Sequence, residues 1–149
     1  MTDGGSELFR LVYASWAVVQ VLPRFDGTVE DILAVARPKN ERLGVTGMLV
    51  AHQGWFLQTL EGPRRQVSHL FGEIGRDLRH AQLELLGAGP AEERLFGAWS
   101  MYARKITPKA TPILHLLDVR GEFDPFGMSV DKALRLLQAV AAAPIEAAA

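Results

Sequence analysis

The chain has 149 residues, of which 48% are hydrophobic and 22% charged, as is typical of one globular domain with a real hydrophobic core. Its formal net charge of −1 excludes a broad basic surface for nucleic acid or membrane lipid, and no apolar run approaches the length of a membrane span. Without cysteine the chain can form neither disulfides nor thiolate metal sites, and we expect it in a reducing cytoplasm. The acidic, glycine-rich residues 1–7 are unlike a signal or transit peptide and predict a flexible N-terminus.

The first predicted elements are a strand and a helix. Residues 8–14 (LFRLVYA) place apolar side chains alternately on one face, as a strand does. Thr28 is a candidate N-cap, after which apolar residues follow helical spacing. Pro38 should end or kink this helix near residues 36–37, because proline lacks the backbone N–H and clashes with the preceding turn.

A β-hairpin and a second helix are predicted next. Gly44 marks a turn, and residues 45–52 and 55–61, joined by a short connection, favour two paired strands. A helix should open at residues 62–63. Its predicted apolar stripe consists of Val67, Leu70, Phe71, Ile74 and Leu78.

The rest of the chain predicts two strands and several helical pieces. Residues 82–87 favour a fourth strand, AEERLFG (91–97) a connecting helical turn, and AWSMYA (98–103) a fifth strand. Two helices should follow, one over about residues 110–118 and one from Ser129, a candidate N-cap, to about residue 142. The apolar stripe of the last helix is Val130, Ala133, Leu134, Leu137 and Val140.

These elements follow the order β-α-β-β-α-β plus one strand. This order predicts an α+β, ferredoxin-like fold with two helices on one face of a sheet, and we expect the C-terminal helices to cover the other face. We therefore divide the chain into residues 1–7, a domain over 8–103, and a helical extension over 104–149 for capping, output or oligomerisation.

No usual catalytic or metal-binding pattern is present. The histidines are not spaced as metal ligands, and each is typical of a surface or capping residue; they are His52, His69, His80 and His115. LLGAGP lacks the third glycine of a dinucleotide fingerprint and predicts a turn. We therefore expect neither a catalytic centre nor a metal site.

Polar side chains on apolar strand faces are more informative. In WFLQTLEG (55–62), Gln58 lies between Phe56 and Leu60 on one face, and a buried amide needs hydrogen-bond partners. The first and third strands of a ferredoxin-like sheet are neighbours, so Tyr13 and Gln58 should lie side by side under the helices. Two readings stay open: a polar pair in the core, or a pair that faces a polar ligand held between the helices.

Further residues suit the second reading. Asn40 and Asp77 lie at the inner edges of the two predicted helices, where they offer donors and acceptors to the imide edge of a flavin or of another heterocycle. Trp99 and Met101 share one face of the predicted fifth strand.

Several stretches together resemble the BLUF family, blue-light sensors that use flavin. The stretches are LFRLVYAS (8–15), ILAVAR with the later N and LGVTGML (32–49), GWFLQTLEGP (54–63), IGRDLRH (74–80) and FGAWSM (96–101). They follow one another in the family's order, and FLQ-x-LEG combined with the early Tyr and the late WSM is a specific signature. Any single piece would be weak.

The resemblance implies a flavin between the two helices, usually FAD, with FMN as the alternative. It implies that Tyr13 gives an electron and a proton to the excited flavin. Gln58, between Tyr13 and the flavin N5/C4=O edge, would then change its hydrogen bonding by rotation or tautomerisation, which shifts the absorption to the red. Asn40 would bond the pyrimidine edge, and Ile32 and Ile74 would sandwich the ring.

The resemblance also assigns roles at the end of the second helix and in the fifth strand. Asp77 would lie near the flavin, and Met101 and Trp99 would relay the switch.

Two positions depart from the family pattern. Lys39 stands where many members have Asn or His, and Glu73 stands where many have Arg or His reaching toward the C2=O side of the flavin. A carboxylate there would repel a carbonyl oxygen unless it points away or is protonated. Pro38 also stiffens the turn that aims Asn40, so these residues bear on flavin affinity and recovery rate.

The sequence thus predicts a blue-light photoreceptor that is not an enzyme and that signals to a separate downstream protein through its C-terminal helices. The helix from Ser129 equally suits a dimer contact, so we expect a homo-oligomer. The alternative is a flavin-free interaction module that kept the fold and lost light sensing. A small enzyme such as an acylphosphatase is disfavoured, because no anion-binding loop pairs an arginine with a suitable asparagine.

Overall fold

The computed structural model describes residues 7–52, 54–97, 101–104 and 125–142. In chain order, the elements are β1 (Leu8–Ala17), the 3-10 helix η1 (Val19–Arg24), α1 (Phe25–Leu43), β2 (Thr46–His52), β3 (Trp55–Pro63), α2 (Arg64–Gly75), β4 (His80–Pro90), β5 (Tyr102–Arg104) and α4 (Val130–Ala142). The helix expected over residues 110–118, and residues 98–100 of the expected fifth strand, lie outside the described residues. Among the described residues, no helix combines the length and the apolar character that crossing a bilayer requires.

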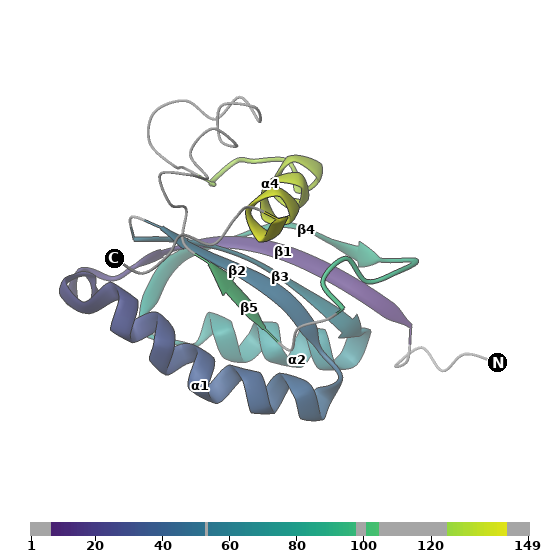
Figure 1. Ribbon diagram of the computed structural model, residues 1–149, viewed down its shortest axis with the longest axis horizontal. Helices are drawn as coiled ribbons and strands as arrows, with labels where there is room; N and C mark the ends of the chain where they lie inside the picture. Colours follow the sequence, from purple (N-terminus) through teal and green to yellow (C-terminus); the bar gives the residue numbers. More distant parts are fainter. Residues whose placement is uncertain (1–6, 53, 98–100, 105–124, 143–149) are drawn as a thin grey trace.

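The sheet has five strands in the order β4-β1-β3-β2-β5. The first four strands pair antiparallel, and β5 runs parallel to β2. Helices α1 and α2 lie side by side on one face, whereas α4 crosses the other face (Figure 1). The predicted α+β, ferredoxin-like fold with a C-terminal helix on the second face is therefore confirmed.

Strands β1 to β4 contribute to two hydrophobic cores, because successive side chains point to opposite faces. On β1, Leu11 and Tyr13 join the core beneath α1 and α2, while Val12 and Ala14 join the core beneath α4. The buried residues of α4 that cover this second core are Ala133, Leu136, Leu137 and Val140. Ser129 Oγ accepts the backbone N–H of Lys132 at 3.2 Å, which confirms the predicted N-cap.

Helix α1 is longer than predicted at both ends. It begins at Phe25, so Thr28 is not the N-cap but a buried residue inside the first turns. It also continues through Pro38 to Leu43, so the expected end near residues 36–37 is wrong. A proline removes one intrahelical hydrogen bond, and packing of α1 on the sheet outweighs that loss. The turn at Gly44 is confirmed, since this residue ends the helix with φ of 70°.

Helix α2 is shorter than predicted. It ends at Gly75, and Leu78 is 89% exposed, so this leucine does not belong to the apolar stripe. The Asp77 carboxylate accepts the backbone N–H of Arg79 at 2.9 Å, and such a local bond competes with continuation of the helix.

The segment at residues 91–97 is not the helical turn that was expected, because a buried carboxylate holds it in an irregular path. Glu61 on β3 is fully buried and accepts the backbone N–H groups of Leu95 and Phe96, each at 2.8 Å. Arg10 Nε donates to the same carboxylate at 2.8 Å. Its charge is therefore paired and its lone pairs are used, as burial requires.

Replacing Glu61 by Gln should destabilise the protein by about 3 kcal/mol, because the amide NH₂ would face N–H donors where an acceptor is needed. Urea unfolding of the purified protein without added ligand measures this change. Glu41→Gln, at an exposed position of α1, is the control and should change the free energy of unfolding by no more than about 0.5 kcal/mol. Equal effects of the two variants would contradict the role assigned to Glu61.

Candidate functional site

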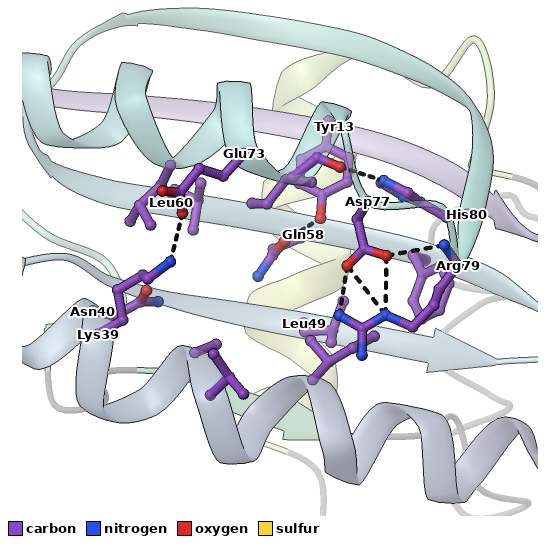
Figure 2. Close-up of a pocket in the computed structure, with 16 residues that line it drawn as sticks. Tyr13, Lys39, Asn40, Leu49, Gln58, Leu60, Glu73, Asp77, Arg79 and His80 are labelled. Atoms are coloured by element: carbon purple, nitrogen blue, oxygen red, sulfur yellow. Dashed lines mark hydrogen bonds and ion pairs between the residues drawn. The ribbon is translucent and has the colours of Figure 1, made fainter.

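A cavity of about 250 Å³ lies between α1, α2 and the sheet face that they cover (Figure 2). Apolar residues form its walls: Ile32, Ala36, Leu49, Phe56, Leu60, Leu70 and Ile74. Polar residues reach it from β1, β3, both helices, the connection between α2 and β4, and the start of β4: Tyr13, Lys39, Asn40, Gln58, Glu73, Asp77, Arg79 and His80. The site thus combines apolar walls with a few convergent polar groups, as small-molecule sites do.

The centre of the site is a buried tyrosine–glutamine pair. Tyr13 and Gln58 are direct partners in the antiparallel register of β1 and β3, so the expectation that they lie side by side is confirmed. The Tyr13 hydroxyl donates to Gln58 Oε1, and Gln58 Nε2 donates to Met101 Sδ at 3.2 Å. A thioether is a weak acceptor, so one side of the amide is held much more weakly than the other.

Tyr13 is protonated in this environment. Burial raises the pKa of its phenol well above the ordinary value, and the nearby negative charge of Asp77 raises this pKa further. The phenol therefore stays neutral at any physiological pH and keeps its O–H available as a donor.

Met101 is fixed on several sides. Arg37 Nε on α1 donates to the Met101 carbonyl at 3.1 Å. The Met101 methyl group lies over Gly47 of β2, where an added Cβ would be 3.2 Å from it and would also collide with the Thr59 carbonyl oxygen. Met101 therefore touches the Gln58 amide and α1 together. Trp99, its expected companion, lies outside the described residues.

The C-terminal part of α1 brings Asn40 and Lys39 to one end of the cavity, as Figure 2 shows. Asn40 is buried, and its backbone carbonyl accepts the N–H of Val45 at 2.9 Å, which ties the helix end to the start of β2. The continuous helix, rather than a break at Pro38, is what aims these two residues inward.

The two departures from the family pattern are paired with each other. Lys39 Nζ on α1 donates to Glu73 Oε2 on α2 at 2.6 Å, and His69 Nε2 lies 3.1 Å from the other carboxylate oxygen. The hydrogen bond from Lys39 lowers the pKa of Glu73, so the carboxyl group is ionised at neutral pH. Repulsion from an isolated carboxylate, which the sequence suggested, therefore does not arise in this arrangement.

The other end of the cavity holds three residues that follow α2. Arg79 forms a two-point ion pair with Asp77, with Nη2 to Oδ2 at 2.6 Å and Nε to Oδ1 at 2.9 Å. His80 Nε2 lies 2.6 Å from the Ile74 carbonyl and Nδ1 lies 2.7 Å from Ser15 Oγ, so His80 caps the end of α2. This agrees with the reading of the histidines as surface or capping residues.

Sequence reasoning missed three residues of this site. Arg79 lies two residues after Asp77, a spacing that permits a local ion pair and could have indicated it. Arg37 gave no signal, because its partner is a backbone carbonyl 64 residues away. His80 was noticed only as an isolated histidine. Within the described part of the chain, no group of three histidine or acidic side chains is placed to hold a metal ion.

Comparisons with known proteins agree with this geometry. The family model for BLUF, sensors of blue-light using FAD, matches residues 8–102. The photoactivated adenylate cyclase subunit alpha of Euglena gracilis is 35% identical over 98 residues, which are 66% of this chain and 9% of that protein. A second relative from the same organism, the photoactivated adenylate cyclase subunit alpha-like protein FB, is 33% identical over 98 residues. These are 66% of this chain and 10% of that protein. The chain thus spans about a tenth of the curated relatives that it matches.

Two solved structures are similar over nearly their whole length. BlsA in its photo-activated state has a TM-score of 0.83 at 26% identity, with 95% of this chain and 99% of that chain covered. The dark state of BlrB, a BLUF protein, has a TM-score of 0.72 at 31% identity, with 91% and 98% covered. This chain belongs to the BLUF family of flavin-based blue-light sensors.

Proposed function

We propose that this protein is a blue-light photoreceptor that holds a flavin between α1 and α2, switches through Tyr13 and Gln58, and signals to a separate protein. The observation that carries this proposal is the buried Tyr13–Gln58–Met101 chain of hydrogen bonds on the wall of the cavity. A core pair without a ligand would not need an adjoining cavity.

The cavity fits the ring system of a flavin. Its volume of about 250 Å³ lies close to the lower end of small-molecule pockets, roughly 300 Å³, and suits one planar ring system better than a whole dinucleotide. Ile32 of α1 and Ile74 of α2 supply apolar groups on the two helices that flank it. FAD and FMN share the same ring, so both suit the cavity; we propose FAD, with FMN as the alternative.

The charges around the cavity also suit an uncharged ring. The carboxylates of Glu73 and Asp77 are each matched by a cation, Lys39 and Arg79, at 2.6 Å. A neutral heterocycle would therefore meet balanced ion pairs rather than a net charge. Asn40 and Gln58 add amide donors and acceptors for its polar edge.

The proposed switch uses residues that can return to their starting state. Bound flavin would absorb blue light and, once excited, act as an electron acceptor. Tyr13 would give the flavin one electron from its ring and one proton from Oη, and would later regain both, so no net reaction remains. Its neutral, buried phenol is in the protonation state that this requires.

The lasting change would be in the Gln58 amide. Oε1 accepts from Tyr13 and Nε2 donates to Met101, so rotation or tautomerisation of the amide exchanges donor and acceptor without moving the backbone. In the low dielectric of the core, the two arrangements become discrete states. Met101 would sense the change first, and we propose Trp99 as the next relay.

The signal would leave through the C-terminal extension. In this proposal, residues 8–103 sense light and residues 104–149 carry the output to a partner protein. Solved relatives include a bacterial light-regulated adenylyl cyclase, of which this chain covers 33%, whereas it covers 98% of BlrB. The apolar stripe of α4 is buried against the protein's own sheet, so a dimer through α4 would use its outward polar face.

Gln58→Leu should retain flavin but lose the reversible red shift, because leucine cannot exchange donor and acceptor. Absorption spectra before and after blue light measure this. Gln138→Leu, at an exposed position of α4, is the matched control and should keep the full shift. A Gln58→Leu variant with an unchanged shift would refute the proposed switch.

Tyr13→Phe should bind flavin with nearly the same affinity and show no stable light-induced state, because phenylalanine has no phenolic proton and is much harder to oxidise. Time-resolved fluorescence should show a longer excited-state lifetime in this variant than in wild type. Formation of the red-shifted state at the wild-type yield would rule out Tyr13 as the donor.

Asp77→Asn should reduce the acid dependence of stability. The hydrogen bond from Arg79 lowers the pKa of Asp77 below its ordinary value, so the ion pair stabilises the folded protein at neutral pH and loses its effect as pH falls through the lowered value. We expect the flavin-free variant to be about 1 kcal/mol less stable at pH 7 and nearly equal to wild type at the acid end of a urea series. Glu30→Gln, exposed on α1, is the control; a difference that is constant with pH would contradict this account.

A further inference from the structure

Lys39 and Glu73 form a bridge between α1 and α2 at the edge of the cavity. Both side chains line the cavity, and each is about one-third exposed. Figure 2 shows the bridge beside Asn40, at the end of the site opposite Asp77 and Arg79. A surface ion pair of this kind adds little stability on its own, so its place at the cavity calls for another explanation.

Lys39 and Glu73 differ in the number of hydrogen-bonding groups that remain for a ligand. One oxygen of Glu73 accepts from Lys39 and the other is 3.1 Å from His69, so the carboxylate is engaged on both sides. The Lys39 ammonium has three N–H groups and gives one of them to Glu73. Within the part of the chain that the structure describes, two donors on a positive charge therefore remain for a ligand next to the buried Asn40.

We propose that Lys39 donates a hydrogen bond to a carbonyl oxygen of the bound flavin ring, and that Glu73 is a positioning residue that holds Lys39 at the cavity. This inference rests on flavin binding as part of the proposed function, and it does not require light sensing. The bridge then presents its positive end to the ligand, and α1 supplies both the cation and the amide of Asn40.

A double variant without any charge separates this role from that of a simple link between the helices. The variants are Lys39→Met, Glu73→Gln, and the double variant Lys39→Met/Glu73→Leu, which replaces the ion pair by an apolar contact between α1 and α2 and leaves no cation at either position. Arg24→Met, which breaks the exposed pair with Asp31 outside the cavity lining, is the control. Thermal unfolding of the flavin-free proteins checks that every variant folds.

Riboflavin, FMN and FAD are titrated in the dark, and infrared spectra are recorded with riboflavin labelled with ¹³C at its ring carbonyls. Lys39→Met should weaken riboflavin binding by about tenfold, the worth of one charge-assisted hydrogen bond, and should raise one carbonyl stretching frequency. Glu73→Gln should have a smaller effect in the same direction. The double variant should keep a melting temperature near that of wild type but show the same loss of affinity and the same carbonyl shift as Lys39→Met.

Three results would overturn the inference. A double variant with wild-type affinity and carbonyl frequency would show that the bridge only joins the helices. A Lys39→Met defect seen with FMN and FAD but not with riboflavin would place Lys39 on a phosphate. Wild-type protein that takes up no flavin overturns both proposals, whereas flavin binding without a light-driven shift overturns the photoreceptor proposal alone.

Discussion

The antiparallel pairing of β1 with β3 is the constraint on which the rest of the structure depends. Its register sets Tyr13 directly opposite Gln58, and the pleat turns both side chains toward α1 and α2. A slip of one residue would turn Gln58 to the face covered by α4 and bring Glu61 beneath α1 and α2. The hydrogen bond between phenol and amide is thus a product of sheet register, and it needs no special backbone geometry.

The two faces of β3 carry polar side chains that differ in how firmly they are held by hydrogen bonds. Gln58 faces the cavity with a weak bond to Met101, whereas Glu61 faces the other way with its carboxylate fully engaged by Arg10, Leu95 and Phe96. In the proposed switch, the first site would change its hydrogen bonding. The second, with its carboxylate fully engaged, would stay as it is and give a fixed point in the same strand.

Sequence patterns predicted the parts of this protein that depend on periodicity. The alternation of β1 and β3 was enough to pair Tyr13 with Gln58, and helical spacing located α2 and α4. The start of α1 and its passage through Pro38 were missed, because packing on the sheet outweighs local preference. The Lys39–Glu73 bridge and the anchor at Glu61 join side chains to groups 34 or more residues away, so only the assembled fold brings them together.

Gly47 limits how this sensor can be tuned. A side chain at this position would collide with the Thr59 carbonyl oxygen of the neighbouring strand and would press on the Met101 methyl group. Under the proposed switch, substitutions that change the rate of return to the dark state would therefore fall at residue 101 itself and at the groups that hold it, above all the guanidinium of Arg37. Position 47 would not be among them, because any substituent there would part β2 from β3.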